Sequence, residues 1–201
     1  MSGDVDGGRR RFLAVSTVSV GGAGLAAAAV PFAESMQPSA RARSLAAPVQ
    51  VDLAGIAQEQ MVTYAWRGQP VFVVHRSARQ LALLQKHDDR LLDPDSKVDQ
   101  QPAWARNPHR SQRPAWLVLV GLCTHLGCVP DYVGSLGREP FDPDWPGGFF
   151  CPCHKSRYDL AGRVYSGVPA PRNLLVPPYR FLDDGRLEIG IGPDVPADAQ
   201  G

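Results

Sequence analysis

Six residues that can bind a transition metal lie in two short motifs of this 201-residue chain. The first motif, C-T-H-L-G-C, spans residues 123–128, and the second, C-P-C-H, spans residues 151–154. Together they hold all four cysteines of the chain. Thiolate and imidazole ligands favour a transition metal over calcium or magnesium. The six residues are Cys123, His125, Cys128, Cys151, Cys153 and His154.

The cysteine count leaves several kinds of site open. Four cysteines allow four thiolate ligands, two ligands with one disulfide, or two disulfides, and a disulfide needs an oxidising compartment. Structural zinc sites usually pair their ligands as C-x2–4-C and H-x3–5-H. The adjacent Cys153 and His154 do not readily bind one tetrahedral ion from a tight turn, and zinc would use only four of the six candidates. A zinc-stabilised binding module is therefore a remote alternative.

An uncharged segment near the N-terminus is long enough to cross a membrane. Residues 12–33 contain no charged side chain, and about 22 helical residues span about 33 Å, against a hydrocarbon core of about 30 Å. The preceding R-R-R-F-L looks like a twin-arginine export signal. Arginines at this end favour a cytoplasmic N-terminus. We predict a retained transmembrane anchor at 12–33, preceded by cytoplasmic residues 1–11; a signal cleaved near Ala40-Arg41-Ala42 and a buried soluble helix are the alternatives.

Two segments of the chain lack the pattern of packed structure. Residues 34–48 are small, polar and bounded by prolines, which is typical of a flexible tether. We therefore predict a hinge at 34–48. Residues 193–201 are predicted to form a loose tail, which leaves 49–192 as the folded head.

The head has the pattern of an all-β domain. The whole chain contains 20 glycines and 19 prolines, a composition that favours a turn-rich β protein over a helical bundle. Alternating residues on either side of R-G-Q-P predict a hairpin, and Ser77 could cap a short helix over 78–85. Residues 86–114 are predicted to be a surface connection and 129–150 a loop. The predicted strands are 49–53, 61–66, 71–75, 116–122, 163–167 and 186–191.

At the two motifs the sequence resembles the Rieske iron–sulfur family. In that family two histidines replace two cysteines on one iron of a 2Fe-2S cluster. The resemblance implies that Cys123 and Cys151 hold one iron and that His125 and His154 hold the other. With two ferric ions, two sulfides and two thiolates such a cluster is neutral, so its reduction potential is roughly −150 to +300 mV, against about −400 mV for four-cysteine ferredoxins.

The resemblance assigns roles to further residues around the cluster. Cys128 and Cys153 match the positions that form a disulfide between the two loops. Ser156 and Tyr158 match hydroxyls that hydrogen-bond a bridging sulfide and a ligand thiolate, and such bonds raise the potential. Leu126, at the tip of the first loop, is expected to be an exposed apolar contact for a docking partner.

The resemblance also implies the fold around the cluster. It is an antiparallel β-sandwich head of the Rieske type with a small cluster-binding subdomain at about 121–172. V-P-A-P at 168–171 resembles the proline loop that shields the cluster. Lys155 stands where many relatives have glycine, which leaves the backbone requirement there open.

Together the anchor, hinge, head and motifs resemble the iron–sulfur subunit of a cytochrome bc complex. This implies a subunit of quinol–cytochrome c oxidoreductase, a respiratory translocase, that works as a redox carrier and is not active alone. An electron from quinol, with ubiquinol expected, is taken at the cytochrome b subunit and passed to a c-type cytochrome as a proton is released. Either His125 or His154 would contact quinol. The expected location is the bacterial inner membrane, single-pass, with the cluster domain periplasmic and the complex dimeric.

Other classes of function find less support in the sequence. A net charge of +1 shows no nucleic-acid footprint. A Rieske oxygenase would need a mononuclear iron site of two histidines and a carboxylate, and the remaining histidines (His75, His87 and His109) show no paired spacing. No Ser/His/Asp arrangement or phosphate-binding glycine loop is present. The main alternative is the Rieske small subunit of a periplasmic oxidase such as arsenite oxidase, which would be released from the membrane.

Overall fold

The computed structural model describes residues 6–37, 39, 44 and 47–195. The chain separates into two compact units, Met1–Ser44 and Leu45–Gly201. The predicted hinge and C-terminal tail, and the candidate cleavage site, fall largely on the residues outside this description. The two units are described separately below.

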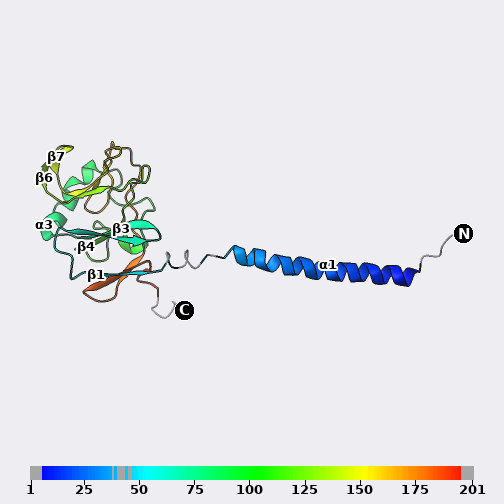
Figure 1. Ribbon diagram of the computed structural model, residues 1–201. Coiled ribbons are helices and arrows are strands. Elements are labelled where there is room, and N and C mark those ends of the chain that lie inside the picture. The colour runs from blue at the N-terminus through cyan, green and yellow to red at the C-terminus, as the bar shows by residue number, and fades with distance from the viewer. Residues whose placement is uncertain (1–5, 38, 40–43, 45–46, 196–201) are drawn as a thin grey trace. The chain divides into compact units, whose positions relative to one another are not determined.

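The described part of the first unit consists mainly of one long helix, α1 (Gly7–Ser35), drawn in blue in Figure 1. Asp6 caps its N-terminus by accepting a hydrogen bond from the Gly8 amide at 3.1 Å. None of its residues is buried, although much of its surface is apolar. By length and composition α1 can cross a membrane.

The second unit is built from short antiparallel strands, which form three three-stranded sheets and one hairpin in the described residues. The first sheet has the order β1 (Val49–Asp52), β11 (Arg186–Ile189), β10 (Tyr179–Phe181). The second has the order β2 (Met61–Trp66), β3 (Gln69–His75), β4 (Trp116–Val120). The third has the order β5 (Asp131–Val133), β8 (Gly148–Phe150), β9 (Arg157–Asp159), and β6 (Gly137–Glu139) pairs with β7 (Asp142–Trp145).

The second sheet contains the predicted hairpin. β2 and β3 pair from Met61↔Val74 to Trp66↔Gln69, and the turn residues Arg67 and Gly68 both have positive φ, as in the turns that suit two-residue hairpins. β3 then pairs with β4, so it is the central strand. Its residues 71–74 are fully buried, which is why this segment reads as an unbroken apolar run.

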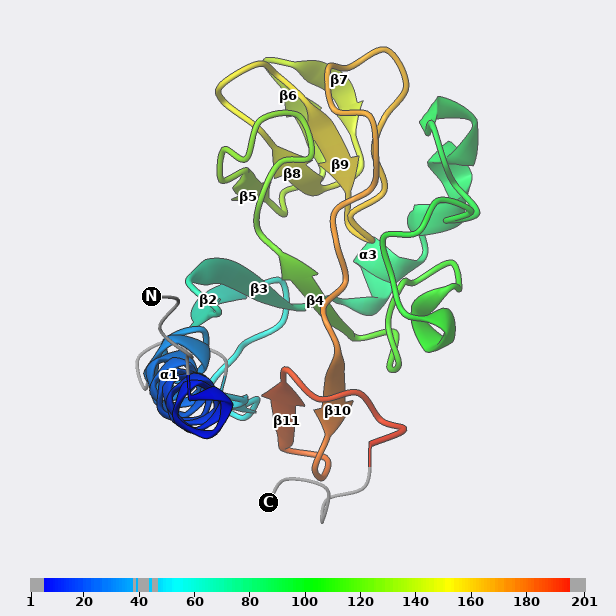
Figure 2. The ribbon, with the colours of Figure 1, turned by 90° about the vertical axis from the view of Figure 1, so that its right-hand side faces the viewer.

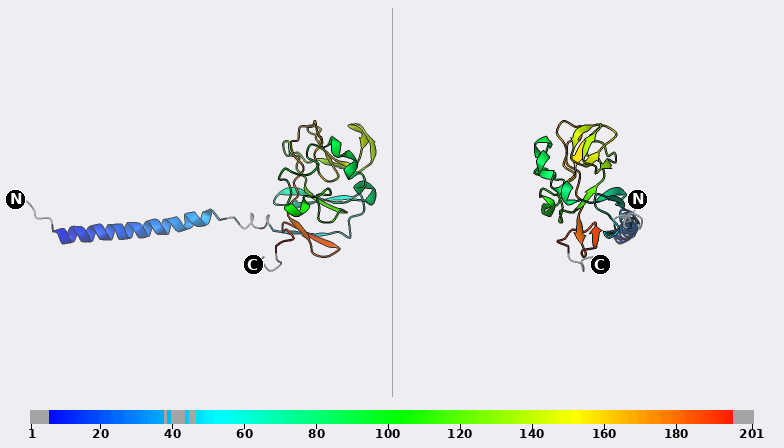
Figure 3. Two further views of the ribbon diagram at one scale, coloured as in Figure 1. Left: turned by 180° about the vertical axis from the view of Figure 1, so that it is seen from behind. Right: turned by 90° about the vertical axis from the view of Figure 1, so that its left-hand side faces the viewer.

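One hydrophobic core joins the three sheets. It includes Val51 and Leu187 of the first sheet, Val73 of the second and Phe149 of the third. Figures 2 and 3 show the β2–β3–β4 sheet between the β10–β11 strands at one end and the β5–β8–β9 sheet at the other. Cys123 and Cys151 lie in the same core. The two metal-binding motifs are thus anchored in a packed scaffold.

Several connections differ from the sequence-based expectation. Ser77 forms the predicted cap, a complete capping box, but helix α3 (Ala78–Leu81) is shorter than expected and is followed by the 3-10 helices η1 (Leu84–Arg90) and η2 (Ala103–Ala105). The predicted loop at 129–150 is wrong, because it contains β5 to β8. The predicted strand at 163–167 is also wrong, since only isolated bridges form there.

The segment 86–114 is not the surface connection that its charges predicted. Arg110 is fully buried and donates to the carbonyl oxygens of Ala161 and Leu174 at 3.0 and 2.8 Å. Arg76 is buried as well and donates to the Leu160 carbonyl at 2.8 Å. Burial lowers the pKa of each guanidinium to about 10. These two arginines hold the turn that follows β9, the strand that comes after the second motif.

Candidate metal centre

The first motif forms a closed loop after β4. The Cys123 amide donates to the Cys128 carbonyl at 2.7 Å, and the Gly127 amide donates back to the Cys123 carbonyl at 2.9 Å. Gly127 has φ of 81°, a left-handed conformation that favours glycine. The backbone of the loop therefore favours the glycine at the fifth position of C-T-H-L-G-C.

The second motif repeats this loop geometry between β8 and β9. The Cys151 amide donates to the Ser156 carbonyl at 2.8 Å, and the Lys155 amide donates back to the Cys151 carbonyl at 2.9 Å. Lys155 occupies the position that Gly127 has in the first loop, and its φ is 62°. A left-handed conformation costs a non-glycine residue about 1–2 kcal/mol. Lys155 thus adopts the left-handed backbone that this loop position needs, at a cost in strain.

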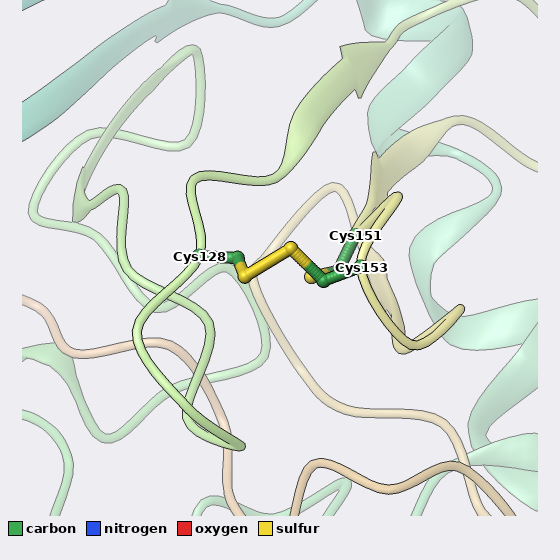
Figure 4. A group of neighbouring side chains, drawn as sticks. All are labelled: Cys128, Cys151 and Cys153. Atoms are coloured by element: carbon green, nitrogen blue, oxygen red, sulfur yellow. A yellow bond between two sulfur atoms is a disulfide. The ribbon is translucent and has the colours of Figure 1, made fainter.

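A disulfide joins the two loops. Figure 4 shows Cys128 bonded to Cys153, with the Cys151 side chain beside the bond. The Cα atoms of the bonded pair are 6.7 Å apart, and the Sγ atoms of all three cysteines lie within 4.8 Å of one another. The pairing is the one that the resemblance implied, and it fixes the separation of the two loops.

Two thiols and two imidazoles remain on the facing sides of the loops. Cys123 and Cys151 are free and buried, 3% and 1% exposed. The rings of His125 and His154 lie edge to face, with their centroids 4.7 Å apart. Nδ1 of His125 is buried and has no hydrogen-bond partner among the described residues. A buried, unpaired nitrogen beside two free thiols is what a metal-ligand set presents before the metal is added.

Two hydroxyl groups that follow the second motif, those of Ser156 and Tyr158, lie close to the Cys123 thiol. Tyr158 is fully buried, and its hydroxyl lies 3.2 Å from Cys123 Sγ and 3.1 Å from the Thr124 amide. Ser156 is also fully buried and accepts a hydrogen bond from the Ala170 amide at 3.1 Å. The Ser156 hydroxyl hydrogen remains available to donate. Ser156 therefore ties the loop at 168–171 to the second motif.

The sequence reasoning missed Thr124. Its hydroxyl lies 3.2 Å from the Tyr158 hydroxyl and donates to the Arg172 carbonyl at 2.7 Å. A hydroxyl residue between the cysteine and histidine of C-T-H was the signal that could have indicated it. The structure leaves His75 outside the site: its Nδ1 lies 2.9 Å from the Ile56 carbonyl oxygen and its ring stacks on Trp116.

The two free thiols differ in acidity. Burial raises the pKa of Cys123, but hydrogen bonds from the Tyr158 hydroxyl and the His125 amide outweigh it, so the net pKa is lowered. Burial raises the pKa of Cys151, and that effect prevails. Since the thiolate is the metal ligand, the neighbours of Cys123 prepare it for binding.

The tip of the site is exposed and partly apolar. Leu126 is 71% exposed, as expected for a contact residue, and His154 is exposed while His125 is half-buried. A groove of about 730 Å³ adjoins His154 and is also lined by Lys155 and Arg157. The candidate ligands thus lie directly behind a surface that a partner can reach.

The residues present fit a two-iron cluster. Two buried thiols, two imidazoles and at least one hydroxyl donor to sulfur match a 2Fe-2S site with mixed ligands. A four-cysteine cluster does not fit, because two of the four cysteines form the disulfide.

Comparison with known families gives two matches that together cover most of the chain. Residues 52–180 match the model described as "Rieske [2Fe-2S] domain". Residues 1–39 match the model described as "Ubiquitinol-cytochrome C reductase Fe-S subunit TAT signal". The second match covers the R-R-R-F-L sequence and the uncharged segment that follows it.

Curated relatives share a single name, "Ubiquinol-cytochrome c reductase iron-sulfur subunit". The protein from Allochromatium vinosum is 50% identical over 182 residues, covering 90% of this chain and 88% of the relative. The proteins from Rhodospirillum rubrum and Blastochloris viridis are 46% and 43% identical, covering 90% and 92% of this chain and 91% and 93% of their own lengths. A chain of the solved structure titled "Hyperthermophilic respiratory Complex III" aligns with a TM-score of 0.49 and 25% identity, covering 88% of this chain and 99% of that chain.

Proposed function

This chain belongs to the Rieske family, among the iron–sulfur subunits of ubiquinol–cytochrome c reductase, and from this premise we propose how its own residues carry out electron transfer. It is an electron-transfer subunit of a cytochrome bc complex, an oxidoreductase, and it carries a 2Fe-2S cluster. The predicted Rieske-type all-β fold with antiparallel sheets is confirmed. The two alternatives, a zinc-stabilised module and an oxidase small subunit, are not favoured.

The ligand set that we propose is Cys123 and Cys151 on one iron and His125 and His154 on the other. The burial of both free thiols and the unpaired Nδ1 of His125 support this assignment. When bound, the cluster supplies a one-electron acceptor and donor. The disulfide between Cys128 and Cys153 holds the two ligand loops at a fixed separation.

We propose His154 as the residue that contacts quinol. Its side chain is exposed whereas His125 is half-buried, and this difference is the observation that carries the assignment. One ring nitrogen of His154 would hold the cluster, and the other would accept a hydrogen bond from a quinol hydroxyl and could take up its proton. The exposed Leu126 supplies an apolar contact that excludes water from this hydrogen bond.

Two hydroxyls tune this site. Tyr158 hydrogen-bonds Cys123 Sγ, and Ser156, buried beside it, has a hydrogen free to donate to cluster sulfur. Such bonds favour the more negative, reduced form and raise the potential. A cluster with a higher potential is a better acceptor for an electron from quinol.

The N-terminal helix anchors the subunit to a bacterial membrane within the bc complex. We propose further that α1 is retained, with residues 1–11 cytoplasmic and the head periplasmic. The partners would be a cytochrome b, a c-type cytochrome and ubiquinol, in a dimeric complex. Alkaline carbonate extraction tests the anchor, because a chain washed off the membrane would contradict it.

A moving head is the second part of the proposal. The anchor is fixed while the electron must travel between two separated partners, so the predicted hinge at 34–48 would let the head swing. Replacing residues 40–46 with a proline-rich linker of equal length should stiffen this segment. We expect the cluster to be retained and quinol-dependent reduction of the c-type cytochrome to be lost; normal turnover would contradict the swing.

The experiment that tests the ligand set compares His154→Gln with His125→Gln in membranes that contain the complex. Each change removes one proposed ligand, so both should lose the spectrum of a mixed-ligand cluster. Substitution of Val129, exposed at the same tip but without a ligand atom, is the matched control. Retention of the cluster in either histidine variant would contradict the ligand set.

A further inference from the structure

The backbone at position 155 does not require a lysine. Its backbone is left-handed, and the same position in the first loop is Gly127. Its side chain is exposed, and none of the hydrogen bonds or ion pairs within the described part of the chain involves its ammonium. The Lys155 amide donates to the Cys151 carbonyl, but a glycine at this position could make the same bond without strain. No contact of the ammonium with the described residues offsets that strain, which points to a contact outside the subunit.

Lys155 lies on the rim of the groove beside His154. The apolar part of the groove includes Phe141 and Phe150, whose rings stack with centroids 4.2 Å apart, and Val168. The groove encloses about 730 Å³. It can therefore accept a side chain or a short loop from a partner protein.

The groove carries positive charge. Besides Lys155 it is lined by Arg157, whose one guanidinium nitrogen, Nη1, bonds the Phe141 carbonyl at 3.2 Å and Asp142 at 3.5 Å. Asp142 is buried and is shared with Arg90, so one carboxylate faces two guanidinium groups. Neither Asp nor Glu is among the described residues that line the groove. A complementary partner surface must offer carboxylates beside an apolar side chain.

We propose that this groove is a docking site for an acidic side chain of the electron-accepting c-type cytochrome, with Lys155 as its principal charge contact and Arg157 as the second. The inference rests on the proposed function. Lys155 is assigned to the contact with the c-type cytochrome because quinol binds in an apolar, membrane-embedded site, where burying an ammonium group is costly. At a water-exposed contact between two proteins, the charge speeds and orients docking instead.

A test of the charge contact uses the intact complex and three variants. Lys155→Gln keeps a non-glycine residue in the left-handed conformation and removes only the charge; Lys155→Glu reverses it; Lys86→Gln, at an exposed lysine away from the groove, is the matched control. After rapid mixing with quinol, the rate of c-type haem reduction is followed at low and high ionic strength. Cluster content is checked by electron paramagnetic resonance in each sample.

We expect Lys155→Gln to slow haem reduction about two- to fivefold at low ionic strength, the range of an exposed ion pair. Lys155→Glu should slow it about tenfold, since a repulsive contact replaces an attractive one. Both differences should shrink at high ionic strength because salt screens exposed charges. Rates equal to those of Lys86→Gln, or losses that do not depend on salt, would overturn the proposal.

Carbodiimide coupling of the purified complex identifies the partner directly, because it joins amines to carboxylates in contact. We expect the peptide containing Lys155 to be joined to an acidic residue of the c-type cytochrome. Coupling to cytochrome b alone, or no coupling of Lys155, would overturn the docking site. If the unaltered complex itself failed to reduce the c-type haem, the proposed function would fail, which is a result distinct from either of these.

Discussion

The hydroxyl of Tyr158 offers the sharpest test of how the protein sets the potential of its cluster. Tyr158 is fully buried, and its hydroxyl lies 3.2 Å from Sγ of the proposed ligand Cys123. Tyr158→Phe removes that one oxygen and leaves the ring in place. The reduced cluster is more negative than the oxidised one, so the lost hydrogen bond destabilises the reduced form more.

The magnitude follows from the energy of the bond. A hydrogen bond to a charged group contributes about 1.5–3 kcal/mol, and only the difference between the two redox states changes the potential. If about a third to a half of that energy is the difference, the change is about 1 kcal/mol, which is about 40 mV for one electron. The Thr124 amide, 3.1 Å from the same hydroxyl, also loses a partner. We therefore expect a lower potential and a slightly less stable loop.

The matched control is Tyr165→Phe. Tyr165 is 2% exposed, and its hydroxyl has no hydrogen-bond partner in the described part of the chain. Removing that oxygen should leave the potential unchanged. Redox titration of the complex, with the cluster followed by electron paramagnetic resonance, measures both variants. An unchanged potential in Tyr158→Phe, or an equal shift in Tyr165→Phe, would refute the role of the Tyr158 hydroxyl.

Three further changes test the scaffold around the cluster. Replacing Cys128 and Cys153 with serine removes a cross-link between residues 25 positions apart. By chain entropy this should lower the free energy of unfolding by about 3.5 kcal/mol, so the cluster absorbance should be lost at a lower temperature. Arg163→Met leaves the buried Asp159 without the guanidinium that lies 2.8 Å away and should cost about 3–5 kcal/mol; a melting temperature like that of the unaltered complex would contradict this. Lys155→Gly relieves the left-handed strain but adds freedom to the unfolded chain, so a gain of at most about 1 kcal/mol is expected in the same thermal measurement.

Local patterns predicted the parts of the fold that depend on neighbouring residues. The hairpin on either side of Arg67-Gly68 and the Ser77 capping box are encoded within a few positions, and both are present. The strands between 129 and 150 were missed because they have only three or four residues each, too few for an alternating pattern to be seen. The pairing of β8 also depends on a partner outside this segment, the strand Arg157–Asp159.

The sequence also did not indicate that a charged side chain would be buried. Arg110 lies in a polar, proline-containing segment that resembles a surface loop, yet it is fully buried. Most of its hydrogen bonds go to backbone carbonyls, among them those of residues 161 and 174, and carbonyl acceptors have no signature in sequence. At the metal centre, by contrast, the resemblance of the two motifs to the Rieske family implied the disulfide between Cys128 and Cys153, which is present; the ligand roles of Cys123 and Cys151 stay a prediction.

The proposed electron transfer depends above all on a 2Fe-2S cluster held by two thiolates and two imidazoles. A redox titration of membranes containing this chain, monitored by electron paramagnetic resonance, tests that claim most directly. We expect the signal of a reduced two-iron cluster with a midpoint potential between roughly −150 and +300 mV. Absence of such a signal, or a midpoint near the value of about −400 mV typical of four-cysteine ferredoxins, would contradict the ligand set.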